Sequence, residues 1–294
     1  MQNLPGFIII GAMKSATTTL QDQLVQQPGI FMSDPKEPNF FSDDEQFAKG
    51  MDWYHGLFDT FPETGLLGEA STHYTKLPTY PDTISRIKAH LPDARFIYVM
   101  RHPVDRLISH YIHEWSMGVY SCDIDEAIEQ YSELVDYSRY AMQLEPYIET
   151  FAHDQVLPVF FDRLIKHPQS ELERVCEFIG YENQPEWHQD LKAKNVSSKR
   201  IRRFPLYNLL IDSRLATFLR RNLIPKQLRN AVKARLRMQD RPVISESMLA
   251  ELEIRFNQDL VMLSQQLNLD KELNCQNFKD VTSSESLDWV RKNV

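Results

Sequence analysis

A short apolar run near the N-terminus constrains the fold more than any other feature of this sequence. Residues 7–10 read Phe-Ile-Ile-Ile, and Gly11 ends the run. Continuous β-branched runs of this kind are typical of strands that are buried on both faces of a parallel sheet. Good helix formers follow from Thr17 to Gln27 and stop before a Pro-Gly pair. The pattern therefore predicts a strand, a short loop and a helix.

The loop between this strand and helix has the composition of an anion-binding turn. Residues 11–16 read Gly-Ala-Met-Lys-Ser-Ala, so that small residues surround Lys14 and open the helix. Free backbone N–H groups and the positive end of the helix dipole favour a phosphate at such a position. The order of residues is not that of a Walker A loop, in which the lysine follows a second glycine. A buried strand followed by an ordinary Ser/Thr-capped helix is the alternative interpretation.

Further apolar segments alternate between strand-like and helix-like patterns. Strands are predicted over residues 66–69, 95–100 and 155–161. Helices are predicted over residues 81–91, 104–115, 171–179 and 245–267. Pro158 weakens the last strand or places it at a sheet edge. Strands that alternate with helices indicate an α/β protein with a largely parallel sheet, most simply as one domain over residues 1–294.

A second group of polar residues follows the predicted strand at residues 95–100. Arg101 stands directly after the strand, Pro103 fixes the turn, and the next helix carries Ser109. Open α/β sheets bind ligands at the carboxyl ends of their strands. Arginine offers a permanently charged bidentate clamp for phosphate, and serine offers a neutral hydroxyl donor. Arg101 and Ser109 are therefore candidate phosphate ligands, although Arg101 taken alone also suits a structural salt bridge.

Together the two segments resemble the sulfotransferases that use 3'-phosphoadenosine-5'-phosphosulfate (PAPS). Residues 11–20 are similar to the family's 5'-phosphosulfate loop, and residues 101–111 to its 3'-phosphate motif. Three more segments are similar to the heparan-sulfate-type and bacterial carbohydrate sulfotransferases: 36–41, 50–54 and 68–74. The resemblance implies a single P-loop-like three-layer domain with a central, mainly parallel sheet flanked by helices.

The resemblance also implies roles for individual residues. Lys14 would hold the 5'-phosphate and stabilise charge as the S–O bond breaks, and Arg101 and Ser109 would bind the 3'-phosphate. Glu37 matches the glutamate that acts as catalytic base in heparan-type enzymes. His73 is the alternative base, one position away from a histidine that cytosolic relatives use. The 5' pocket would be lined, largely through backbone amides, by Ser15, Ala16, Thr17 and Thr18.

One position departs from the family pattern. Heparan-type relatives commonly carry a lysine near the transferred group where this sequence has Ala70. We expect Lys199 or Arg200 to supply the missing cation, because a basic loop there, which includes Ser198, is similar to the loop that closes over the nucleotide. PAPS is the only co-substrate implied. No metal is expected, since no His, Cys or carboxylate cluster has ligand spacing.

Charge is distributed unevenly along the chain. Residues 192–241 contain 15 Lys and Arg against two acids, a local charge of +13 in a protein whose net charge is -8. We expect a basic, mainly helical insertion or lid there, which is a candidate for contact with an anionic membrane surface. Nucleic acid is disfavoured as a partner, because aromatic residues are not interleaved with these charges. The residues from 273 to 294 are polar and predict a loosely held tail.

The cysteines and the N-terminus bear on location. Cys122, Cys176 and Cys275 are far apart, so neither a disulfide framework nor a structural zinc site is expected. The apolar run at residues 7–10 is too short for a signal peptide or a membrane span. The sequence therefore favours a cytoplasmic location, or a chain from which an anchor has been removed.

These observations predict an enzyme that moves a sulfuryl group from PAPS to a hydroxyl or amine by in-line displacement without a metal. The expected acceptor is a glycan or glycolipid, and other small molecules are also compatible. A P-loop-type nucleotide kinase is the first alternative, but it would need a Walker-type loop and acids that bind Mg²⁺. A non-catalytic nucleotide- or anion-binding module is the second. The sequence does not indicate the oligomeric state.

Overall fold

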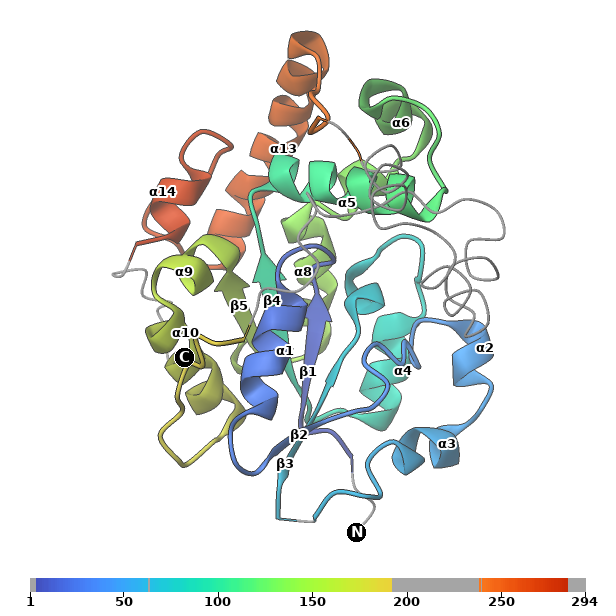
Figure 1. Cartoon of the computed structure of the whole chain (residues 1–294), viewed down its shortest axis with the longest axis vertical. Coiled ribbons are helices and arrows are strands. Elements are labelled where there is room, and N and C mark those ends of the chain that lie inside the picture. The colour runs from blue at the N-terminus through green and yellow to red at the C-terminus, as the bar shows by residue number, and fades with distance from the viewer. Residues whose placement is uncertain (1–3, 63, 192–237, 239, 285–294) are drawn as a thin grey trace, which may run out of the picture.

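A five-stranded parallel sheet forms the centre of the structure, which is a computed structural model that describes residues 4–62, 64–191, 238 and 240–284. The strand order is β2-β3-β1-β4-β5, and the strands point toward the top of Figure 1. Their bounds are β1 (Phe7–Gly11), β2 (Ile30–Met32), β3 (Leu66–Ala70), β4 (Arg95–Met100) and β5 (Val156–Phe160). Every pairing between neighbouring strands is parallel, as the sequence predicts.

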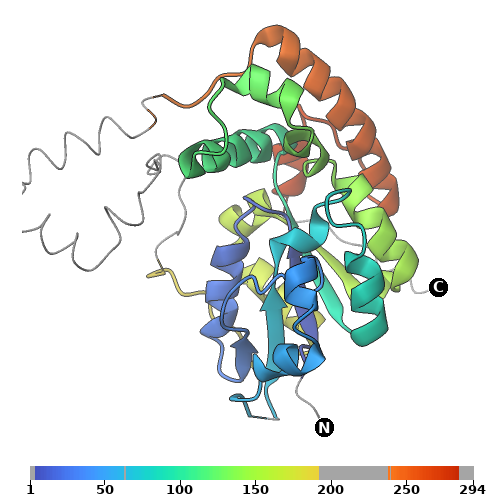
Figure 2. The ribbon, with the colours of Figure 1, turned by 90° about the vertical axis from the view of Figure 1, so that its right-hand side faces the viewer.

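Helices cover both faces of this sheet (Figures 1 and 2). The predicted helices are present as α1 (Thr17–Val25), α4 (Thr83–His90), α5 (Pro103–Met117), α10 (Pro168–Ile179) and α13 (Glu246–Gln266). The further helices among the described residues are α2 (Asp44–Phe47), α3 (Met51–Gly56), α6 (Ile124–Gln130), α7 (Glu133–Asp136), α8 (Tyr140–Thr150), α9 (Phe161–Lys166) and α14 (Phe278–Thr282), with 3-10 turns at Thr72–Thr75 and His153–Gln155. Within the part of the chain described, no helix is long and apolar enough to cross a bilayer.

The alternation of side chains along β1 builds a hydrophobic core on each face of the sheet. Phe7 and Ile9 pack in the core that includes α1 and α10. Ile8 and Ile10 point the other way, into the core that includes α4, α5, α8 and α13. A strand covered by helices on both faces has no solvent-facing position, which explains why residues 7–10 are continuously apolar. The predicted three-layer arrangement is confirmed.

The predicted edge position of Pro158 is also confirmed. β5 is the last strand of the sheet and pairs with β4, with Pro158 opposite Tyr98. An edge strand tolerates proline because its outer side needs no ladder N–H. The carbonyl oxygen of Pro158 accepts a hydrogen bond from Arg174 Nη2 at 2.8 Å, so that α10 is tied to this edge.

The prediction of a loosely held tail is wrong for residues 273–284. Phe278 in α14 is fully buried, and its ring packs edge-on against the imidazole of His102. His102 Nε2 lies 2.9 Å from the carbonyl oxygen of Cys275. A few apolar side chains therefore anchor this segment beside the turn between β4 and α5, although its average composition is polar.

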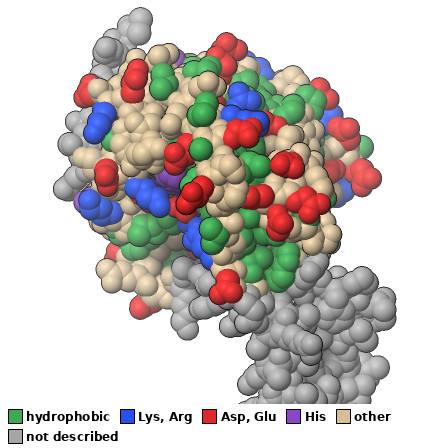
Figure 3. All heavy atoms as spheres, turned by 90° about the horizontal axis from the view of Figure 1, so that it is seen from above, with side chains coloured by type: hydrophobic (Ala, Val, Ile, Leu, Met, Phe, Trp, Pro, Cys, Tyr) green, Lys and Arg blue, Asp and Glu red, His purple; other side chains and the backbone are tan. Residues whose placement is uncertain are grey.

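One face of the molecule carries charged side chains of both signs. Figure 3 views the molecule from the top of Figure 1, and acidic side chains are spread over that face between apolar patches and Lys and Arg.

The basic segment at residues 192–237 lies outside the described residues, as does residue 239. The prediction of a helical lid or membrane contact there stays a prediction.

Asp259 on α13 caps a neighbouring helix from the interior of the protein. Its buried carboxylate accepts hydrogen bonds from the backbone N–H groups of Ala141 and Met142, in the first turn of α8, at 2.9 and 3.2 Å. Burial raises the pKa of Asp259 to about 6, although these hydrogen bonds act in the opposite direction.

The raised pKa of Asp259 is expected to make stability depend on pH. Because the folded pKa is above the unfolded value, the contribution of this group is full at acid pH and is lost as pH rises through about 6. At about 1.4 kcal/mol per pKa unit, the loss is on the order of 3 kcal/mol. We expect the free energy of unfolding of the wild type, relative to Asp259→Asn, to fall by this amount between about pH 4 and pH 7 in urea titrations. Asp123→Asn, at the exposed start of α6, is the matched control. A difference between wild type and Asp259→Asn that does not vary with pH would contradict the assignment.

Candidate active site

The carboxyl ends of β1, β3 and β4 bring the predicted site residues to one edge of the sheet. The N–H of Ala12 donates to Val99 O at 2.7 Å, which ties the loop after β1 to the end of β4. Thr75 Oγ1 donates to Ile10 O at 2.9 Å and ties the segment after β3 to the same place. Gly11 is required here because a Cβ at this position would lie 1.9 Å from Thr75 Oγ1. The connections on the two sides of β1 run in opposite directions across the sheet. Open α/β sheets bind ligands at such a topological switch point.

The loop before α1 presents backbone N–H groups toward this edge. Lys14 and Ala16 have φ angles of 72° and 67°, in the left-handed region that few residues other than glycine adopt. Ala16 is the N-cap of α1 and provides no side-chain oxygen to the N–H groups of the first turn. Ser15 and Thr17 are buried, whereas Lys14, Ala16 and Thr18 are partly exposed. A strained loop that leaves N–H groups available at a helix N-terminus fits a phosphate.

Arg101 and Ser109 lie on the neighbouring β4–α5 unit. The hydroxyl of Tyr140 accepts from the N–H of Arg101 at 3.2 Å and donates to its carbonyl oxygen at 2.5 Å, which fixes the strand end. The Arg101 guanidinium lies 4.7 Å from the centre of the Phe161 ring, and its buried Nε has no partner among the described residues. Ser109 follows on α5 and is 7% exposed. A guanidinium that is held on a ring face and still has a donor to offer suits an anion.

Asp105, in the first turn of α5, joins this unit to the C-terminal segments. Lys279 Nζ and Arg241 Nη2 lie 2.6 and 2.8 Å from its carboxylate. Burial would raise the pKa of Asp105, but Lys279 and the nearby Arg101 outweigh it, so the pKa lies below its ordinary value. The ion pairs hold α14 next to the turn that carries Arg101.

Glu37 lies in the loop after β2, beside the end of β3. Its N–H donates to Ala70 O at 3.0 Å. Its carboxylate accepts from Lys36 Nζ at 2.8 Å and from the hydroxyl of Thr72 at 3.3 Å. Burial alone would raise the pKa of Glu37, but Lys36 and other nearby positive charges outweigh it, so the pKa lies below its ordinary value. Glu37 is therefore ionised at neutral pH, and its side chain, 34% exposed, is available to a bound hydroxyl.

A chain of hydrogen bonds from a buried carboxylate holds the loop that carries Glu37. Glu69 in β3 is fully buried and accepts hydrogen bonds from the hydroxyls of Ser71, at 2.6 Å, and Tyr54. Ser71 Oγ in turn accepts from the N–H of Asn39 at 3.0 Å. Burial raises the pKa of Glu69, against the effect of these hydroxyl donors. Tyr54 and Glu69 thus hold the loop that carries Glu37 through Ser71 and Asn39.

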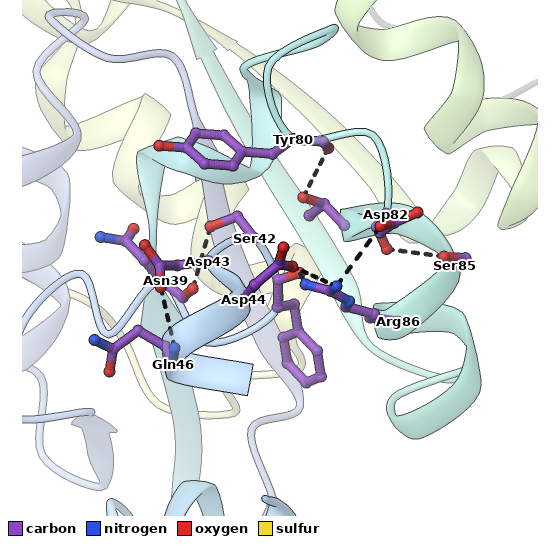
Figure 4. A network of polar contacts seen from close by, with 11 residues as sticks. Asn39, Ser42, Asp43, Asp44, Gln46, Tyr80, Asp82, Ser85 and Arg86 are labelled. Atoms are coloured by element: carbon purple, nitrogen blue, oxygen red, sulfur yellow. Dashed lines mark hydrogen bonds and ion pairs between the residues drawn. The ribbon is translucent and has the colours of Figure 1, made fainter. Parts of the chain in front are cut away.

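A polar network on the outer side of this loop is shown in Figure 4. Asp43 Oδ1 accepts from the N–H of Gln46 at 3.0 Å and so caps α2. Arg86 Nη2, from α4, lies 2.6 Å from the carboxylate of Asp44. The network joins residues 39–46 to residues 80–86 and fixes the segment that contains Tyr80.

His73 lies near Glu37 in the 3-10 turn after β3. Its ring stacks on Tyr80 with a centroid distance of 4.9 Å and an interplanar angle of 16°. Burial, with a smaller effect from Lys76, lowers the pKa of His73 to about 4, so the ring is neutral at neutral pH. The structure therefore brings together the two side chains that the sequence offers as alternative bases, and only Glu37 is charged there.

Lys76 is a site residue that the sequence analysis missed. Burial lowers its pKa to about 8, although the carboxylates of Glu37 and Glu114 act in the opposite direction. Its ammonium lies 5.6 Å from the centre of the Tyr137 ring. A single lysine between Thr75 and Leu77 carries no sequence pattern, and the only hint was the missing cation at Ala70.

Other predicted residues are not reached by the structure. Ser198, Lys199 and Arg200 lie outside the described residues, so their predicted contact with the nucleotide stays a prediction. Over the described ranges, no three His, Cys, Asp or Glu side chains gather in the way that metal ligands do. All three cysteines are free, and Cys176 packs in the core as predicted.

Comparisons with known proteins agree with this arrangement. The model of the "Sulfotransferase family" matches residues 46–185, which include His73, Arg101 and Ser109. Mouse "Heparan sulfate glucosamine 3-O-sulfotransferase 3B1" is 34% identical over 191 residues, which cover 61% of this chain and 47% of the mouse protein. Over these residues the chain is similar to the sulfotransferase family.

Two further matches agree with this similarity. Human "Heparan sulfate glucosamine 3-O-sulfotransferase 3A1" is 32% identical over 191 residues, or 61% of this chain and 45% of the human protein. The chain thus spans about half the length of the curated relatives it matches. A solved sulfotransferase from Alicyclobacillus acidocaldarius superposes with a TM-score of 0.64 and 22% identity, covering 92% of this chain and 98% of that one. It shares the sulfotransferase fold with this chain.

Proposed function

We propose that this protein transfers a sulfuryl group from PAPS to a hydroxyl or amine of its acceptor. The observation that carries the proposal is the pairing of two anion sites on neighbouring strands, the Lys14 loop after β1 and Arg101 after β4, tied together by the bond from Ala12 N–H to Val99 O. A donor with a phosphosulfate at one end and a phosphate at the other suits this pair. The unpartnered Nε of Arg101 fits such a ligand.

Different residues of the chain have different roles in the transfer. Lys14 and the N–H groups at the start of α1 stabilise the negative charge that develops on the departing 5'-phosphate, an electrostatic effect that needs no reorganisation. Arg101 and Ser109 hold the 3'-phosphate and so fix the position of the donor. Glu37, ionised and partly exposed, accepts the proton of the acceptor. PAPS supplies the activated sulfuryl group when it is bound.

The proposed acceptor is a glycan or glycolipid. The mouse and human relatives are heparan sulfate glucosamine 3-O-sulfotransferases by name, and the identity to them spans 61% of this chain. His73 stacks on the partly exposed Tyr80 and lies near Glu37 and Lys76, so polar and aromatic groups are both available to a sugar. Heparan sulfate is therefore the first acceptor to assay.

Nucleotide selectivity tests the proposal. Adenosine-3',5'-bisphosphate (PAP), the expected coproduct, should raise the melting temperature well above the effect of AMP, ADP or ATP with Mg²⁺, because binding to the native state stabilises it. Stabilisation by ATP and Mg²⁺ alone would replace the proposal with a nucleotide kinase. Binding of PAP without any turnover of PAPS across an acceptor screen would favour a non-catalytic binding module.

Replacing Arg101 by lysine is expected to weaken PAP binding at least about tenfold and to leave AMP binding unchanged. Lysine keeps the charge but loses the planar bidentate geometry and the stacking on Phe161. Calorimetric titration with both nucleotides measures the effect. Arg95→Lys is the matched control, because Arg95 lies at the other end of β4 and donates to Phe178 O at 2.7 Å. Equal loss of PAP and AMP affinity would argue against a 3'-phosphate site.

A further inference from the structure

The side chain of Lys76 is partly buried, and its ammonium group forms no hydrogen bond or ion pair with any described residue. Its contact is with the face of the Tyr137 ring. Taking an ammonium out of water without an acceptor is costly, and burial lowers the pKa of Lys76 to about 8 as a result. An anionic ligand at this position would restore the missing interaction.

The backbone around Lys76 is fixed from three sides. Tyr147 donates its hydroxyl to Tyr74 O at 2.8 Å, and Thr75 Oγ1 donates to Ile10 O. The side chain of Gln143 bonds both the N–H and the carbonyl oxygen of Leu77, each at 2.8 Å. The base of the lysine side chain is therefore preorganised, as expected of a group that binds a reacting atom.

The charged and titratable groups around Lys76 define its place in the site. Glu37 faces it from the loop after β2, His73 from the 3-10 turn, and Tyr137 from the end of α7. Glu114, Arg106 and His110 face it from α5.

His110 links the two lysines of the site. Burial holds the pKa of His110 well below its ordinary value, and Arg106, Lys76 and Lys14 lower it further. Lys76 thus shares one neighbour with Lys14, at the donor end of the site, and has Glu37, at the acceptor end, as another.

We propose that Lys76 binds the oxygens of the sulfuryl group during its transfer. This inference rests on the function proposed above. In that reaction the bond between sulfur and the bridging oxygen of the 5'-phosphosulfate breaks, and its electron pair stays on the phosphate oxygen. A bond forms between sulfur and the acceptor oxygen or nitrogen, whose proton passes to Glu37. Lys76 supplies the positive charge beside the moving group, a place for which Ala70 offers no charged side chain.

A comparison of PAPS with PAP tests the role of Lys76 without knowledge of the acceptor, because the two nucleotides differ only in the sulfuryl group. Lys76→Met is expected to weaken PAPS binding about tenfold, the effect of losing one charge-assisted hydrogen bond, and to change PAP binding less than about twofold. Lys76→Arg should keep most of the preference for PAPS. Lys88→Met is the matched control, since Lys88 also lies over an aromatic ring, 4.9 Å from the centre of Phe151.

The pH dependence gives a second readout. The preference of the wild type for PAPS over PAP should decline as pH rises through about 8, where Lys76 loses its proton, and the Lys76→Arg variant should not show this decline. Equal effects of Lys76→Met on both nucleotides, or no effect on either, would overturn the inference while leaving the proposed function intact. Failure of the wild type to bind either nucleotide would overturn the proposed function itself and the inference with it.

Discussion

Replacing Lys14 by alanine is expected to lower the turnover of PAPS by ~10²–10³ and to leave the protein folded, because one preorganised donor to the developing charge is removed. The φ angle of 72° at this position is as unfavourable for lysine as for alanine, so the substitution does not select against the loop conformation. The measurement is the release of PAP from PAPS with heparan sulfate as acceptor, together with the melting temperature.

The control for this prediction is Lys88→Ala on α4, which removes an exposed lysine that lies outside the site. It should keep the turnover of the wild type. Near-wild-type turnover in Lys14→Ala would remove Lys14 from the mechanism. A large fall in melting temperature would instead assign the lysine a structural role.

The second large effect is expected for Glu37→Gln, which should lower turnover by ~10²–10⁴ through loss of the general base. Glutamine keeps the size of the side chain. Its carbonyl oxygen can accept from Lys36 Nζ as Oε1 of Glu37 does, and its NH2 group can donate to the hydroxyl oxygen of Thr72 in place of the bond to Oε2. PAP binding should therefore be unchanged in calorimetric titrations, whereas the rate of sulfate transfer falls.

His73→Asn is the comparison that decides between the two candidate bases. Its effect on turnover should be the smaller one, because the His73 ring is stacked on Tyr80, whereas the carboxylate of Glu37 is 34% exposed and available to a bound hydroxyl. A larger loss in His73→Asn than in Glu37→Gln would reverse the assignment.

The sheet was predictable where its strands are long and buried on both faces. Residues 7–10 and 96–100 are continuous apolar runs, and each proved to lie in a strand covered by helices on either side. β2 was missed because its three residues, Ile30–Met32, are too few to show a period. The tail was misjudged because Phe278, a single buried ring, outweighs its polar neighbours.

The site residues divide in the same way, into those that the sequence predicts and those that it does not. Lys14 and Arg101 could be predicted because each stands directly after a strand, in a local pattern whose meaning does not depend on distant residues. Lys76 could not, since its significance comes from Glu37, Glu114 and Tyr137, which are remote in sequence and meet only in the folded chain.

The contacts of the C-terminal segment also set an order of events during synthesis. The five strands that the structure describes lie before residue 161, and the N-terminal part of a chain leaves the ribosome first. The sheet can therefore form while α13 and α14 are still to be made. The turn that carries Arg101 gains its contacts with Cys275 and Lys279 only afterwards. In a nascent chain the sheet would therefore form before the nucleotide site is complete. The ability to bind the donor would be gained later, in a separate step.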